Sequence, residues 1–233
     1  MLWNRPALGL DVVALTHSDA DHAGGLAAIL KHFAVGQFWE TGWWTPAADA
    51  TRQAVERSGL PRRVLRAGDR IWIGEALITV LNPDGRDPVA LNDESLVMRF
   101  DWRGLSLLLT GDLGPEGEAR VQERGGPLRV SVLKVAHHGS RFSSTSPFLD
   151  AVRPTIAVVS VGARNPFRHP TPQALGRLAT AGAHVYRTDR DGAVIVESDG
   201  TRLWVTRWAS QSTETFELAR EASAPERTAA PGT

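Results

Sequence analysis

Short apolar runs that end in polar clusters recur along this chain, and they predict buried strands followed by chemically active loops. The run at 10–16, LDVVALT, is short and rich in β-branched residues, which is typical of a buried strand. The run that ends at Thr110 and the run at 130–136 have the same character. Each is followed at once by Asp or His side chains, so three strand ends are candidate parts of one site.

The other patterns predict a mixed α+β fold. Apolar residues at helical spacing indicate a helix from about Ala23, and a Pro or Thr start signal marks two further helices. The helices are expected at 23–33, 46–58, 114–123 and 171–182. The remaining strands are expected at 37–40, as two or three antiparallel strands within 62–81, on both sides of a turn at 102–104, at 154–162, and as three short strands within 183–206.

Length and composition predict one folded domain and a tail. The 233 residues are 42% hydrophobic and 22% charged, as in globular proteins. Residues 1–208 are expected to form the domain, and residues 209–233, polar and then rich in alanine and proline, a flexible tail. The sequence contains no run of 18 apolar residues and no signal-peptide pattern, so neither a membrane anchor nor an export signal is expected.

Charge and cysteine content narrow the chemistry. Lys plus Arg and Asp plus Glu both number 26, so no overall field attracts DNA, and a polyanion would need a local basic patch. The arginines between 52 and 70 offer one, although a solvated face is the alternative for them. Three nearby tryptophans could stack on bases or belong to the core: Trp39, Trp43 and Trp44. Without cysteine, a metal would be held by His and carboxylates.

The segment HSDADH places four potential ligands within six residues, directly after the first predicted strand. Two carboxylates beside two imidazoles would cost several kcal/mol in desolvation and repulsion without a cation between them. The alternative is an exposed turn whose histidine caps the next helix. We expect a metal site built on His17, Asp19, Asp21 and His22.

Later strand ends add further candidates. Asp112 alone would be an ordinary turn residue, but next to a metal it could bridge two cations. His137 and His138 are consecutive, so on a continuing strand they would point to opposite sides, and we expect one metal ligand and one contact to a ligand or to substrate. Ordinary polar loop residues are the alternative for this pair. His169 precedes a helix start, where it could contact a phosphate or protonate a leaving group; a plain surface loop is the alternative.

Taken in order, LTHSDADHAGGL, NDESLVMRF, LLLTGDL, LKVAHHGS and NPFRHPTP resemble the successive motifs of the metallo-β-lactamase superfamily. Within it they are most similar to the hydrolase domain of the ComEC/Rec2 competence proteins, over about residues 10–205. The resemblance implies an αββα sandwich with metals at one edge. It also implies metal ligands at His17, Asp19, Asp21, His22, Asp112, and His137 or His138.

The sequence departs from the family pattern in three places. Asp19 stands where many members have a second histidine, which moves the preference from zinc towards manganese or magnesium. A histidine expected before the bridging aspartate is missing, with Asn92 and Asp93 the nearest polar candidates. Family members have several strands before the first motif, whereas only about ten residues precede it here, so either the chain begins late or part of one sheet is absent. If those strands are absent, an open sheet edge is expected that a homodimer or a partner chain could complete.

The function that these features predict is phosphodiester hydrolysis with one or two divalent metal ions. The expected ion is manganese or zinc, with magnesium as a further possibility. Asp21 is expected to act as the general base and His169 at the leaving group. The substrate contacts are expected at Ser140, Arg141, Asn165 and Arg168. The resemblance implies a nuclease for DNA uptake, acting on single-stranded DNA outside the cytoplasmic membrane beside a membrane channel. Two alternatives are a hydrolase of a small phosphoester, ester or lactone, and an inactive binding module.

Overall fold

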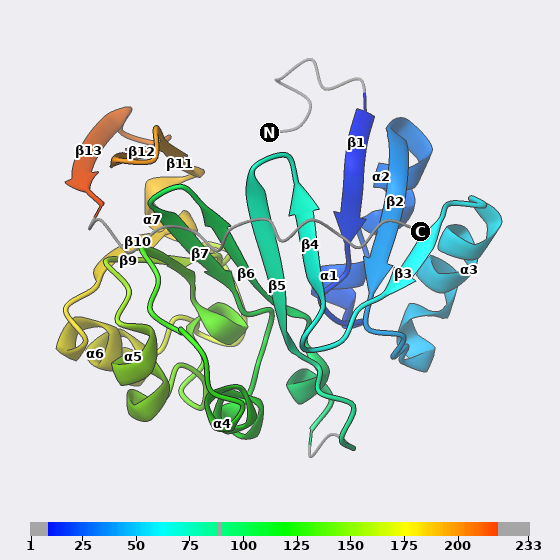
Figure 1. Ribbon diagram of the computed structural model, residues 1–233, viewed down its shortest axis with the longest axis horizontal. Coiled ribbons are helices and arrows are strands. Elements are labelled where there is room, and N and C mark those ends of the chain that lie inside the picture. The colour runs from blue at the N-terminus through cyan, green and yellow to red at the C-terminus, as the bar shows by residue number, and fades with distance from the viewer. Residues whose placement is uncertain (1–8, 88–89, 219–233) are drawn as a thin grey trace, which may run out of the picture.

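A seven-stranded mixed sheet is the centre of the computed structural model, which describes residues 9–87 and 90–218 (Figure 1). Its strand order is β10-β9-β8-β7-β6-β5-β4. Strands β4 to β7 run antiparallel to their neighbours, and β7 to β10 run parallel. The strands are β4 (Arg70–Ile73), β5 (Ala76–Asn82), β6 (Val97–Trp102), β7 (Leu105–Leu109), β8 (Val132–Lys134), β9 (Ile156–Val159) and β10 (His184–Arg187).

The N-terminal part forms a small parallel sheet, in the order β1 (Gly9–Ala14), β2 (Ala34–Glu40) and β3 (Arg62–Val64). Its connections are helical: α1 (Ala20–Ala23) and α2 (Leu26–His32), then the 3-10 turn η2 (Pro46–Ala48) and α3 (Asp49–Arg57). Of the two or three antiparallel strands expected within 62–81, β4 and β5 are confirmed, whereas β3 runs parallel to β2. The chain reaches β3 through a helix, and such a crossover returns the strand parallel to β2.

The C-terminal part forms an antiparallel sheet of β11 (Val194–Ser198), β12 (Arg202–Arg207) and β13 (Ser212–Glu217). The domain boundary expected at residue 209 therefore falls too early. Residues 212–217 form a strand whose side chains are alternately half-buried and exposed, and Phe216 packs against the core beside Leu203 and Val205. The rest of the expected tail, 219–233, lies outside the described residues.

Helices and sheets are layered as an αββα sandwich. The helices α4 (Pro115–Glu123), α5 (Ser146–Val152) and α6 (Pro172–Thr180) cover one face of the large sheet, around the buried Leu108, Leu133 and Phe148. On the other face, the β1–β3 sheet packs over β4 to β7 through Trp39, and the β11–β13 sheet packs over β8 to β10. The second β-layer is thus made of two separate sheets.

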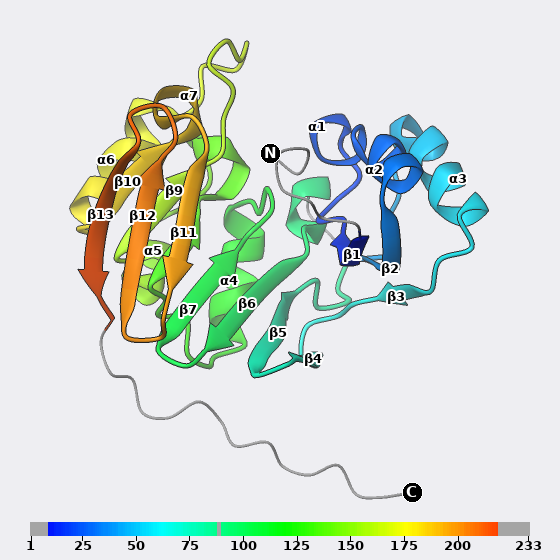
Figure 2. The same cartoon turned by 90° about the horizontal axis from the view of Figure 1, so that it is seen from above.

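The division of that layer leaves two strands at open edges. β1 and β11 are each terminal in their sheets, and neither has a strand on its outer side among the described residues. Figure 2 shows them facing each other across β5, β6 and β7. Phe100, Leu107 and Leu109 on β6 and β7 are only partly buried. Within the described residues, this division leaves the second β-layer open between β1 and β11, as expected if the N-terminal strands of the family are absent.

Candidate metal centre

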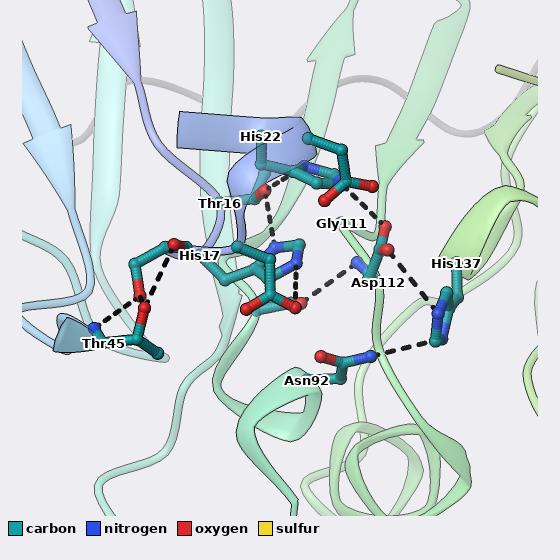
Figure 3. A network of polar contacts seen from close by, with 12 residues as sticks. Thr16, His17, His22, Thr45, Asn92, Gly111, Asp112 and His137 are labelled. Carbon is teal, nitrogen blue, oxygen red and sulfur yellow. Dashed lines mark hydrogen bonds and ion pairs between the residues drawn. The ribbon is translucent and has the colours of Figure 1, made fainter. Parts of the chain in front are cut away.

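Three strand ends bring their polar side chains to one point (Figure 3). The first loop and α1 follow β1 and carry His17 to His22, while Asp112 follows β7 of the large sheet. β8 leads into the short 3-10 segment η4 (Ala136–Gly139), which carries both consecutive histidines. Because β7 and β8 are parallel neighbours, their carboxyl ends lie at the same edge of the sheet. The expected convergence of the three strand ends is therefore seen.

Four side chains form the centre of this cluster. Asp21, His22, Asp112 and His138 each offer one ligand atom, and these atoms all lie within 4.8 Å of one another. His138 Nε2 is 3.1 Å from an Asp21 oxygen and 3.2 Å from an Asp112 oxygen. His22 Nε2 is 3.1 Å from the other Asp112 oxygen and 3.3 Å from His138 Nε2. Two imidazoles and two carboxylates thus face a common centre.

Outer contacts orient the imidazoles towards that centre. His138 Nδ1 donates to the backbone carbonyl of Ser160 at 2.7 Å, so in the neutral ring the lone pair is on Nε2 and faces the cluster. The Thr16 hydroxyl lies 3.1 Å from Nδ1 of both His17 and His22. A lone pair that faces two carboxylates needs a cation or a proton between them. These donor atoms therefore fit a divalent metal ion.

The backbone at the histidine pair explains how both rings reach the same carboxylate. His137 has φ 46° and His138 has φ 54°, so both lie in the left-handed region, which costs non-glycine residues of order 1–3 kcal/mol each. The chain turns instead of continuing as a strand. His138 joins the cluster, while His137 Nε2 lies 3.9 Å from Asp112 and His137 Nδ1 contacts the Asn92 amide at 3.2 Å.

Asp112 is the electrostatic centre of the cluster. Its burial acts to raise its pKa, but hydrogen bonds from His138 and His22 and the Lys134 charge outweigh burial, and the pKa is held well below its usual range. In turn, Asp112 raises the pKa of His138. Lys134 Nζ is 3.6 Å from Asp112 and donates to the Gly111 carbonyl. Sequence reasoning missed this lysine, although a charged residue inside the apolar run VSVLKVA was a visible signal.

His17 and Asp19 lie beside the cluster and outside its centre. The rings of His17 and His22 are 4.1 Å apart, and His17 Nε2 is 3.6 Å from Asp19. Burial, with the neighbouring His22 charge, lowers the pKa of His17 to about 4. Its Nε2 is buried and makes no hydrogen bond to any described residue. A neutral imidazole with an unused lone pair is what a second cation would require.

A cavity of about 320 Å³ opens next to the cluster, with Asp21, His138 and His169 in its wall. Burial and the nearby His137 lower the pKa of His169, so this ring is neutral near pH 7. Asn165 also lines the cavity, but its side chain donates to the carbonyls of Gly162 and His169 and accepts from the His169 amide. Asn165 therefore holds the loop that lines the cavity, and its expected substrate contact stays a prediction.

The other expected substrate contacts are divided by burial. Ser140 is buried, and its hydroxyl accepts from the Phe142 amide, so it offers little surface to a substrate, and its expected contact stays a prediction. Arg141 and Arg168 are exposed, and the Arg141 guanidinium stacks on the Phe142 ring. Asp93, one substitute for the missing histidine, is buried and accepts from the Ala90 and Gly117 amides. It therefore has a structural role.

The arginines of 52–70 make a weaker basic patch than expected. Arg62 pairs with the buried Glu40, Arg52 pairs with Glu56, and Arg66 donates to two backbone carbonyls. Of the three tryptophans, Trp39 belongs to the core and Trp44 stacks on Phe38. Trp43 is 46% exposed and lines a smaller pocket with His17 and Asp19.

The fold and the cluster agree with the family comparison. The model of the metallo-beta-lactamase superfamily matches residues 1–163, and the chain belongs to this superfamily. It is 34% identical over 79% of its length to ComE operon protein 3 of Bacillus subtilis, and 34% identical over 79% to competence protein ComA of Neisseria gonorrhoeae. Recombination protein 2 of Haemophilus influenzae is 30% identical over 85%. The chain spans about a quarter of the length of these relatives.

Solved structures confirm the fold alone. CmlA, a diiron beta-hydroxylase from Streptomyces venezuelae, superposes with a TM-score of 0.54 at 14% identity, over 80% of this chain and 45% of that one.

Within the described part of the chain, no helix combines the length and apolar character that a membrane crossing needs.

Proposed function

We propose that this chain is a metal-dependent phosphodiesterase that cleaves single-stranded DNA during DNA uptake. The observation that carries the proposal is the convergence of Asp21, His22, Asp112 and His138 beside an open cavity. The similarity to competence proteins supports DNA as the substrate.

The residues fit one ion at the cluster and a second beside it. Asp21, His22, Asp112 and His138 would hold the first ion, and His17, Asp19 and Asp112 would hold the second. Mixed oxygen and nitrogen ligands suit manganese or zinc better than magnesium, which prefers oxygen alone. When bound, such an ion lowers the pKa of a water molecule towards 7 and stabilises negative charge on phosphoryl oxygens.

The surrounding residues supply orientation and proton handling. The Asp21 side chain is 61% exposed and faces the cavity, where its free oxygen can accept a proton from the attacking water. Neutral His169 can donate a hydrogen bond from its ring to a phosphate oxygen or the leaving group. Thr16 and the Ser160 carbonyl keep the imidazoles aligned, which limits rearrangement during the reaction.

The natural partners and location extend this proposal. We expect the domain to work at the outer face of the cytoplasmic membrane beside a DNA channel. The open edges of β1 and β11 offer backbone groups to which a channel segment or a second copy could add strands. Light scattering of the purified chain distinguishes these cases, because a homodimer doubles the measured mass and a separate channel partner leaves it monomeric.

The test is a nuclease assay on single- and double-stranded DNA with manganese, zinc or magnesium added. Asp21→Ala and His22→Ala are expected to lower the cleavage rate at least about 100-fold, because each removes a proposed ligand. Asp150→Ala, an exposed carboxylate on α5, is the matched control and should keep full activity. Wild-type protein that binds metal but leaves DNA intact would contradict the proposal.

The zero net charge and the internally paired arginines favour one competing function, hydrolysis of a small phosphoester, ester or lactone. Turnover of a small chromogenic diester, without cleavage of single-stranded DNA, would select it. Protein that takes up no manganese, zinc or iron would instead select the inactive binding module.

A further inference from the structure

An exposed phenylalanine stands in the wall of the cavity that adjoins the metal cluster. Phe167 is 74% exposed, the largest exposed fraction among the large apolar side chains of the described residues. It shares the cavity with Asp21, His138 and His169. A single exposed apolar side chain is ordinary on a protein surface, but this one borders the proposed reaction centre. A ligand with an apolar face, bound in this cavity, would cover the Phe167 ring.

The Phe167 ring is held as a platform. Its plane is 20° from that of His169, with the ring centroids 6.0 Å apart, which is an offset-stacked arrangement. His169 in turn makes an edge contact with His137 at 5.8 Å, so a row of rings leads from the cluster to Phe167. One face of Phe167 is therefore supported by His169, while most of the ring remains accessible to solvent.

The loop beneath the platform is fixed by its own hydrogen bonds. The Asn165 amide closes residues 162–169 with three bonds of 2.8–2.9 Å. Across the cavity, Thr188 Oγ1 donates to the Val161 carbonyl and accepts from the Val161 amide. A platform set in advance loses little conformational freedom when a flat ligand stacks on it.

We propose that Phe167 stacks on a nucleobase next to the phosphate that the metal cluster holds, which selects single-stranded nucleic acid. This inference rests on the proposed phosphodiesterase function and names the residue that would select a single strand. Every base offers a π-face, so stacking is tolerant of sequence, but in a duplex both faces are covered by neighbouring bases. The cavity, about 320 Å³, is at the lower end for small-molecule sites and suits one nucleotide unit.

The cavity composition favours a nucleotide over an apolar peptide. Beside Phe167 and Pro166 the wall carries Ser160, the Asp21 carboxylate and the imidazoles of His138 and His169. Arg168 is exposed next to the platform and can approach a backbone phosphate. An aromatic face beside a cation site matches a base next to the scissile phosphate of one strand.

The test measures binding with a single-stranded decamer that has nuclease-resistant phosphorothioate linkages and one 2-aminopurine, in the presence of manganese and over a time in which the decamer stays intact. Phe167→Ala should weaken binding roughly 5- to 100-fold and reduce the quenching of 2-aminopurine. Phe167→Trp should keep both. The matched control is Phe142→Ala, since Phe142 is 61% exposed, stacks with Arg141 and lies outside the cavity wall.

A backbone-only decamer, in which every base is absent, isolates the stacking. Wild type and Phe167→Ala should bind it equally, because the platform has nothing to receive. The inference would be overturned if Phe167→Ala lost as much affinity for the backbone-only decamer as for the decamer with bases. It would also be overturned if Phe142→Ala lost as much affinity for the decamer with bases as Phe167→Ala does. Cleavage of an unmodified decamer by wild type is measured separately, so failure of the proposed nuclease activity and failure of base stacking give different results.

Discussion

Replacing Asp112 with asparagine tests the electrostatic centre of the cluster without changing its shape. Asp112 is 3% exposed, and its oxygens lie 3.1 Å from His22, 3.2 Å from His138 and 3.6 Å from Lys134. The substitution keeps the volume and removes the negative charge. The Lys134 ammonium then has no carboxylate partner within the distances described, and no full set of anionic ligands remains for a cation.

The expected magnitude follows from the burial of these groups. Removing one partner of a buried ion pair costs about 3–5 kcal/mol, and the lower end applies because the Lys134 side chain is 21% exposed. For a chain of this size each kcal/mol corresponds to roughly 2–4 °C. The metal-free Asp112→Asn protein should thus melt about 10 °C below wild type. Wild type should also gain about 2.7 kcal/mol from manganese at 100 times its Kd, and the variant should gain almost nothing.

Thermal unfolding followed by circular dichroism, with EDTA and then with manganese, measures both effects. Asp21→Asn is the control, since the Asp21 side chain is 61% exposed. Its metal-free stability should stay within about 0.5 kcal/mol of wild type, while its gain from manganese falls. An Asp112→Asn protein that melts with wild type in EDTA, or that still gains fully from manganese, would refute the reasoning.

Two further predictions concern the neighbours of the cluster. His17 has a folded-state pKa of about 4 against an ordinary 6.5, so the unfolded chain takes up the proton first, and stability falls as the pH is lowered from about 6.5 to about 4. In metal-free protein this loss of unfolding free energy amounts to about 3 kcal/mol, and it should be absent from His17→Asn. Urea unfolding at pH 7 and pH 4 measures the loss. Equal losses in wild type and in His17→Asn would exclude His17 as the source. Gly139→Ala should cost about 2 kcal/mol and weaken metal binding, because φ is +82° and a Cβ would lie 2.5 Å from Pro170 Cβ. Gly125→Ala, at φ +73° with no atom within 4 Å, should cost only about 1 kcal/mol in the same denaturation assay and leave metal binding unchanged.

The strand ends could be predicted from the sequence because buried apolar runs are followed directly by clusters of polar, metal-ligating side chains. A run such as LDVVALT must be buried, and polar residues directly after it must lie at a sheet edge. The direction of β3 was missed because three residues carry no signal of their pairing partner. β13 was missed because its sequence, STETFE, is polar apart from Phe216 and so carries no alternation of polar and apolar residues.

Side-chain roles were harder to predict than strand positions. Spacing alone could not show that His137 and His138 both adopt left-handed backbone angles, since that region is uncommon for any residue other than glycine and is imposed here by the tertiary fold. Likewise, Ser140 and Asn165 resemble substrate contacts in the sequence, but hydrogen bonds to their own loops use their polar atoms. A polar side chain becomes available to a ligand only when its local backbone leaves it unpaired.

The four cluster residues come from different β-layers of the sandwich. Asp21 and His22 follow β1 of the small parallel sheet, whereas Asp112 and His138 follow β7 and β8 of the large one. An ion held among them would join two halves of the molecule that otherwise meet mainly through apolar packing. Removing the ion with a chelator would then weaken the interface between the two sheets before either part unfolds. Backbone amides at that interface would exchange their hydrogens with solvent first.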